Sequence, residues 1–128
     1  MNYNFTKKVD YTFQEALEKT KEALKAEGFG VISEIDLKEK FKEKLDLDFR
    51  EYMILGACNP ALAHKAIEQE DKIGTMLPCN VLVQEHAGGN VEVTAINPME
   101  SMSSVGNDNL TEVAKEVSEK LKTALDKL

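Results

Sequence analysis

The sequence lacks long apolar runs, and this absence limits where the protein can reside. No run approaches the about 20 apolar residues that span a bilayer. Residues 1–10 contain no apolar segment of the length found in a signal peptide. There are only two cysteines, which are more often reduced than paired in an intracellular chain. We therefore expect a cytoplasmic protein with free thiols.

Positive charge is also in short supply. The chain has 16 Lys and Arg residues against 23 Asp and Glu residues, which gives a net charge of −7 at pH 7. Such a surface repels the phosphates of nucleic acids and the headgroups of anionic membranes. We therefore expect neither a nucleic acid nor a membrane as a partner.

Internal repeats and low-complexity segments are absent, and the length of 128 residues predicts a single domain covering residues 1–128. A chain of this length can bury a core without disulfides or a metal. Hydrophobic residues make up 42% of the sequence and charged residues 30%, which is typical of a soluble globular protein.

Hydrophobic periodicity predicts the element order β-α-β-α-β-α-β-β-α. The expected strands cover residues 3–9, 29–35, 50–58, 77–86 and 91–96. The expected helices cover residues 13–27, 37–44, 60–69 and 110–128. A Gly-Gly turn separates the last two strands and indicates a hairpin. The third strand is apolar on both faces and is expected to be central.

Polar residues at the predicted helix starts favour specific caps. The expected N-caps are Thr12 with Glu15, Asp36 with Glu39, Asn59 before Pro60, and Asn109 with Glu112. Gly28 is expected to end the first helix in the left-handed conformation. The inward residues of the two short helices are expected to be Leu37, Phe41, Leu45, Leu62, Ala63, Ala66 and Ile67.

This order predicts an α+β fold of two layers, with a five-stranded, mainly antiparallel sheet. The first and last helices are expected to pack on one face of that sheet. The other face then lacks cover, and dimerisation is the simplest way to bury it. Pro78 is restricted to a strand start, an edge or a bulge, since proline cannot donate to a ladder.

Two Cys-Asn segments stand out. Residues 54–60 read ILGACNP, with Ala63 following, and residues 73–81 read IGTMLPCNV. Upstream, residues 28–36 read GFGVISEID, followed by Lys40 and Leu45. With these motifs, essentially the whole chain resembles the bacterial and archaeal family called domain of unknown function 302. The resemblance implies a TATA-binding-protein-like fold and a homodimer, but it implies no activity.

The first Cys-Asn segment predicts an anion site. Cys58 would precede the N-cap of a helix, where the positive end of the helix favours a thiolate. The N–H groups of Ala61 and Leu62 could then meet an anion. A structural alternative is that Cys58 is simply a small buried hydrophobe.

The second cysteine could approach the first if the third and fourth strands are neighbours. A disulfide between Cys58 and Cys79 would require Cα atoms within about 7 Å. The chain has no Cys-x-x-Cys motif of the thioredoxin type. The candidate ligand-binding residues are Cys58, Asn59, Pro60, Pro78, Cys79, Asn80 and Glu34.

Other chemistry is less well supported. A metal site would need Cys58, Cys79 and His64, whose spacing matches no standard zinc pattern, so we predict no metal ligand. Glu34 and Asp36 share a strand face, but Asp36 suffices as a cap and Glu34 could pair with Lys40 at the surface. His86 is expected at the surface. Residues 99–102, which include two methionines, form either a lid or a core edge.

Three functions remain open. The first is a small cytoplasmic dimer that binds a small ligand, either anionic or neutral, near the Cys-Asn motifs. The second is a thiol-based redox or metal-handling protein. The third is a purely structural or interaction domain. No pattern identifies a reaction, a ligand or a cofactor.

Overall fold

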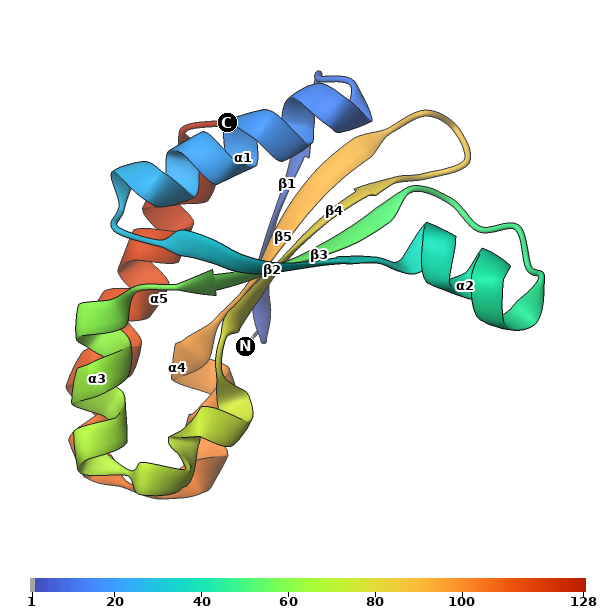
Figure 1. Cartoon of the computed structure of the whole chain (residues 1–128). Helices are drawn as coiled ribbons and strands as arrows, with labels where there is room; N and C mark the ends of the chain where they lie inside the picture. Colours follow the sequence, from blue (N-terminus) through green and yellow to red (C-terminus); the bar gives the residue numbers. More distant parts are fainter. Residues whose placement is uncertain (1) are drawn as a thin grey trace.

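A five-stranded antiparallel sheet forms the centre of the computed structural model, which describes residues 2–128 (Figure 1). The strands lie in the order β1-β5-β4-β3-β2. Their bounds are β1 (Asn4–Val9), β2 (Gly30–Asp36), β3 (Tyr52–Cys58), β4 (Cys79–Glu85) and β5 (Val91–Ile96). The predicted hairpin of β4 and β5 is confirmed. β3 lies inside the sheet between β2 and β4, as expected for a central strand, although the middle position belongs to β4.

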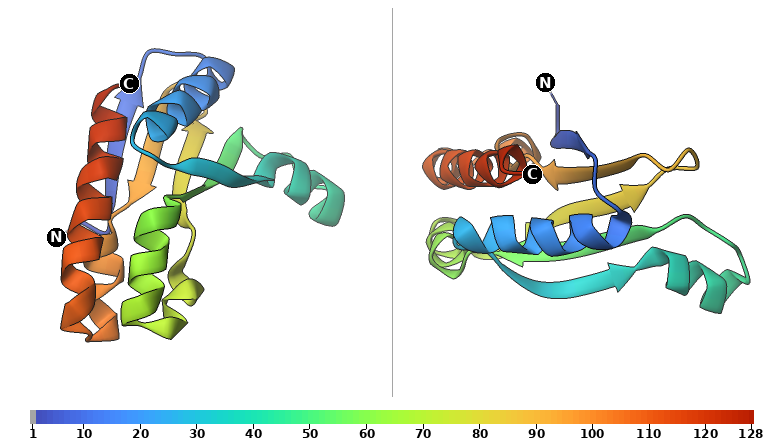
Figure 2. Two further views of the ribbon diagram at one scale, coloured as in Figure 1. Left: turned by 60° about the vertical axis from the view of Figure 1, so that its left-hand side comes forward. Right: turned by 90° about the horizontal axis from the view of Figure 1, so that it is seen from above.

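Helices cover one face of this sheet, which confirms the two-layer α+β prediction. The α-helices are α1 (Phe13–Ala26), α2 (Leu37–Leu45), α3 (Pro60–Gln69), α4 (Pro98–Ser101) and α5 (Thr111–Asp126). The 3-10 helices are η1 (Asp71–Met76), η2 (Ser103–Val105) and η3 (Asp108–Leu110). α1 packs on β2, β4 and β5, and α5 packs on β1 and β5. α3 lies beside α5 (Figure 2, left).

The core lies between the sheet and these helices. Leu55 of β3, Val81 and Val83 of β4, and Val93 of β5 are 0% exposed. They alternate with residues that face the other side of the sheet, as a half-buried strand requires. The apolar face of α5 is also buried, and its Leu121 is 0% exposed.

Three of the four predicted N-caps are confirmed. Thr12 Oγ1 accepts from the Glu15 N–H at 3.1 Å, and Glu15 Oε1 accepts from the Thr12 N–H at 3.1 Å. The bond from the Thr12 N–H holds the pKa of Glu15 below its ordinary value. Asp36 and Asn59 cap α2 and α3 as predicted. Gly28 follows α1 with φ of +86°.

The fourth expected cap was wrong. α5 begins at Thr111, and Leu110 at its N-cap position makes no side-chain capping bond. Asn107 instead accepts from the Asn109 N–H at 3.0 Å and so caps the preceding η3 turn. The extra turn displaces the start of α5, and Asn109 becomes part of η3.

Two expected inward residues also face solvent. Leu45 of α2 is 66% exposed and Ile67 of α3 is 44% exposed. α2 projects from the sheet at the end of β2 and buries no residue (Figure 1). Its Phe41 ring contacts Phe49 at 4.9 Å between centroids.

The sheet face opposite α1 and α5 carries partly exposed apolar residues. Ile35 of β2 is 43% exposed and pairs with the half-buried Ile54 of β3. Ile54 pairs in turn with the half-buried Leu82 of β4. We call the patch of Ile35, Ile54 and Leu82 the open face.

Candidate functional site

The two Cys-Asn segments meet at one end of the sheet. β3 ends at Cys58 and β4 begins at Cys79. Ala57 lies opposite Cys79 in the antiparallel register, so Cys58 and Cys79 lie on neighbouring strands with an offset of one residue. Strand spacing across and residue rise along the sheet place their Cα atoms roughly 6 Å apart. β3 and β4 are neighbours, which meets the condition under which the two cysteines were expected to approach each other.

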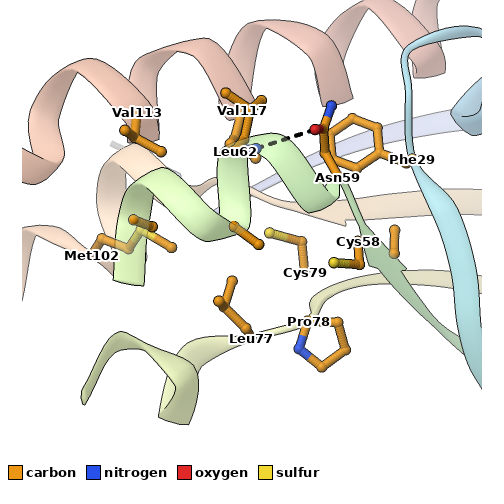
Figure 3. Close-up of a pocket in the computed structure, with 13 residues that line it drawn as sticks. Phe29, Cys58, Asn59, Leu62, Leu77, Pro78, Cys79, Met102, Val113 and Val117 are labelled. Atoms are coloured by element: carbon orange, nitrogen blue, oxygen red, sulfur yellow. Dashed lines mark hydrogen bonds between the residues drawn. The ribbon is translucent and has the colours of Figure 1, made fainter. Parts of the chain in front are cut away.

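A small pocket lies at this junction (Figure 3). The cavity measures about 20 Å³. It is closed by parts of β3, α3, β4 and α5 and by the segments before β2, before β4 and after α4. Its lining residues are Phe29, Ala57, Cys58, Asn59, Leu62, Ala63, Ala66, Leu77, Pro78, Cys79, Met102, Val113 and Val117. None of these residues is charged.

Both cysteines are free thiols. Cys79 is 5% exposed and Cys58 is half-buried. Both cysteines line the pocket, and in the view of Figure 3 their sulfur atoms point in the same direction. Burial raises the pKa of Cys79 to about 11, and the nearby Cys58 adds to the rise. At neutral pH the pocket therefore holds Cys79 as a thiol.

This burial should make the fold less stable in alkali. The unfolded chain releases the Cys79 proton near its ordinary pKa of 9.0, whereas the folded chain keeps it to about pH 11. The stabilisation is present in full below pH 9 and is lost as the pH rises toward 11. The expected loss is about 2–3 kcal/mol of unfolding free energy.

Urea unfolding at pH 8, 9, 10 and 11 measures this loss. Cys79→Val replaces the thiol with an apolar group, and its stability should fall less steeply over the same range. Equal slopes for both proteins would show that Cys79 does not titrate as a buried thiol.

Asn59 joins two segments at the pocket, the start of α3 and the end of α1. Its Oδ1 accepts from the Leu62 N–H at 3.3 Å, and its Nδ2 donates to the Glu27 carbonyl at 3.4 Å. A Cβ on Gly28 would lie 2.9 Å from Nδ2. Asn59 therefore ties the start of α3 to the end of α1, which is a structural role in addition to capping.

Two substitutions separate these roles. Asn59→Ala removes both bonds and should cost about 1–2 kcal/mol of unfolding free energy. Asn59→Asp keeps the acceptor for Leu62 but loses the donor to Glu27, so it should retain most of the capping contribution. Urea unfolding at pH 7 compares the three proteins. Equal losses for Ala and Asp would mean that capping contributes nothing.

The predicted anion site is weakened by the same geometry. Asn59 occupies the Leu62 N–H, so only Ala61 remains of the two N–H groups that were expected to meet an anion. The lining has no positive side chain. The pocket is therefore better suited to an uncharged or soft ligand than to an anion.

Three of the seven candidate residues lie away from the pocket. Pro60 and Asn80 are exposed. Glu34 forms an ion pair with Lys21 of α1 at 3.0 Å. The expected pairing of Glu34 with Lys40 was wrong, since Lys40 lies 3.7 Å from Glu43.

Neither histidine lines the pocket. His64 Nε2 lies 3.2 Å from Glu68, with a side chain that is 74% exposed. His86 lies 3.0 Å from Glu92 and is 44% exposed. Within residues 2–128 no three His, Cys, Asp or Glu side chains are arranged to hold a metal ion.

Met102 is a pocket residue that sequence reasoning did not identify. It is 5% exposed and packs with Ala66, Ile73 and Leu110. Of the lid and core-edge alternatives, its burial fits the core edge, whereas Met99 is 37% exposed. The apolar stripe of α5 was visible in the sequence, but nothing local indicated that Val113 and Val117 would face Cys79.

No described helix combines the length and apolarity that a bilayer crossing requires. Comparison with known proteins identifies a family that covers nearly the whole chain. The model of the family described as domain of unknown function DUF302 matches residues 5–128. The chain belongs to the DUF302 family.

A solved relative agrees with this assignment. The crystal structure of an uncharacterised conserved DUF302 protein from Bacillus stearothermophilus is 30% identical, with a TM-score of 0.92. The match covers 98% of each chain. No curated protein matches the sequence. The antiparallel sheet and long C-terminal helix implied by the family resemblance are both present.

Proposed function

We propose that this DUF302 domain is a binding module whose small ligand occupies the pocket between the two Cys-Asn segments. The observation that carries the proposal is the convergence of both motifs on one cavity, with two free thiols in its wall. A structural role alone would require neither thiol, because a larger apolar side chain could fill the space. The lining favours a soft or apolar ligand over an anionic one.

Cys58 is half-buried, whereas Cys79 is buried, so Cys58 is the more accessible of the two thiols in the pocket wall. Iodoacetamide should therefore alkylate Cys58 in the native protein faster than Cys79. Alkylation displaces iodide from the reagent and forms a thioether, and intact mass with peptide mapping assigns each site. Alkylation of Cys58 would show that a small molecule can reach the pocket, which ligand binding requires.

Two alanines of α3 provide a matched test. Ala63 lines the pocket, whereas Ala61 is exposed on the same helix and does not line it. Ala63→Leu should fill the entrance and slow Cys58 alkylation by about tenfold or more, since the reaction depends on exposure. Ala61→Leu should leave the rate unchanged. Cys58 alkylation as slow as that of Cys79 in wild-type protein would contradict the proposal.

We also infer that the module works as a homodimer that buries the open face. Apolar residues on an uncovered sheet face favour association. Ile35 and Ile67 give a matched pair, with exposures of 43% on the open face and 44% on α3. Ile35→Lys should weaken dimerisation by at least about tenfold, or about 1.4 kcal/mol. Ile67→Lys should not. Sedimentation velocity measures both, and a monomeric wild-type protein would contradict the inference.

A further inference from the structure

The pocket has room for about one atom. Its volume of about 20 Å³ slightly exceeds the roughly 10–15 Å³ that one water needs. Pockets for organic ligands usually measure about 300–1,000 Å³. A buried water makes about three hydrogen bonds. The lining offers few polar groups for them, because both ends of the Asn59 amide are already bonded.

Sulfur is the chemistry that this cavity does offer. Cys58 and Cys79 both line it, and Met102 adds a thioether to the same wall. Soft sulfur donors select soft ions such as Cu(I), whereas Zn(II) in structural sites takes four ligands. Residues 2–128 provide no set of three His, Cys, Asp or Glu ligands at this place. The donors therefore match an ion that accepts two thiolates.

We propose that Cys58 and Cys79 together bind one Cu(I) ion as a two-coordinate dithiolate. This proposal rests on the proposed function and names the ligand class. Both S–H bonds break, two Cu–S bonds form, and two protons pass to solvent. No electron is transferred. The complex carries one negative charge.

The copper ion cancels one of the two thiolate charges, which leaves a single negative charge within a wall that has no positive side chain. Cys58 lies one residue before the N-cap of α3, where the helix dipole stabilises negative charge. The rest of the wall is apolar and excludes water that would compete for the ion. Both thiols come from the ends of paired strands, so the sheet register sets the separation of their Cα atoms, and both residues line the same cavity.

Anaerobic titration of the reduced protein with Cu(I), in competition with bicinchoninate, tests the proposal. Wild-type protein should take one copper per chain and release two protons, measured by native mass spectrometry and by pH. Outer-shell partners of a metal site are worth about 10–100-fold in affinity. Loss of a direct ligand in Cys58→Ser should therefore weaken binding by more than about 100-fold.

Cys79 is buried, so its replacement needs two variants to separate ligand loss from misfolding. Cys79→Val fills the site and Cys79→Ala leaves a small gap; both should lose copper while keeping the wild-type circular dichroism spectrum. Met102→Leu should change the affinity by less than about tenfold, since the thioether is not one of the two ligands. Zn(II) is the control ion and should not displace Cu(I).

The outcomes distinguish the Cu(I) proposal from the proposal that the domain is a binding module. If Cys58 is alkylated in the native protein but wild-type protein takes no copper from the chelator, the Cu(I) proposal fails and the binding module stands. If Cys58→Ser keeps wild-type copper affinity, the dithiolate assignment is wrong. If Cys58 is inert to iodoacetamide, both proposals fail.

Discussion

Gly56→Ala should lower the unfolding free energy by about 3 kcal/mol, which is at the upper end of the usual cost of overpacking. Gly56 lies in β3, two residues before Cys58. A Cβ at this position would overlap Ser33 Oγ and lie 2.8 Å from Pro78 Cγ. Ser33 can turn its hydroxyl away, but the proline ring is rigid, so the backbone of β3 or β4 must move. Urea unfolding at pH 7 measures the change.

Gly30→Ala is the matched control for this substitution. Gly30 begins β2, and nothing lies within 4 Å of its added Cβ. Its replacement should be neutral or stabilise the fold by up to about 1 kcal/mol. Ser33→Ala should recover part of the Gly56→Ala loss through a coupling of about 0.5–1 kcal/mol. A Gly56→Ala loss no larger than that of Gly30→Ala would contradict the close approach.

Leu121→Ala should cost about 3–5 kcal/mol of unfolding free energy. Leu121 is 0% exposed and belongs to the core that α5 forms with the sheet. The substitution removes buried methyl groups and leaves a cavity that rigid strands cannot close. The same measurement, urea unfolding at pH 7, gives the magnitude.

Leu45→Ala makes the same chemical change on α2. Leu45 is 66% exposed, so the expected cost is within about 0.5 kcal/mol. The comparison also tests the finding that α2 projects from the sheet. A large loss of unfolding free energy for Leu45→Ala with a small loss for Leu121→Ala would contradict the packing of α5, rather than α2, against the sheet.

Local features of the fold were predictable from the sequence because their causes are local. Thr12 and Glu15 form a capping box through residues three apart, and Asn59 followed by Pro60 fixes the start of α3 in the same way. Asn109 failed as a cap because Asn107, two residues earlier, makes the competing turn. The sequence pattern alone does not show which of two asparagines, two residues apart, will form the cap.

The inward faces of short helices were less predictable. Ile67 continues the apolar pattern of α3, but α3 lies at the end of the sheet beside α5 and buries only a narrow stripe. Ile67 therefore remains 44% exposed. The direction in which a short helix packs depends on its tertiary neighbours, which its own periodicity does not specify.

The site was predictable only in part for a similar reason. Cys58 and Cys79 both line the pocket because β3 and β4 are adjacent, an arrangement that the sequence pattern allowed but did not specify. Met102 closes the pocket from more than twenty residues beyond Cys79, after the β4–β5 hairpin and the turn of α4. Glu34 is held by Lys21 across the layer between β2 and α1. Contacts of this kind depend on the fold as a whole.

Native mass spectrometry of gently purified, reduced protein tests most directly whether the thiol pocket is a binding site. Wild-type protein should carry one additional small species per chain, and both Cys58→Ser and Cys79→Val should lack it while keeping the same oligomeric state. A wild-type protein that has the bare mass of its chains, and that stays bare after incubation with Cu(I), would contradict the account and leave the Cys-Asn segments with a purely structural role.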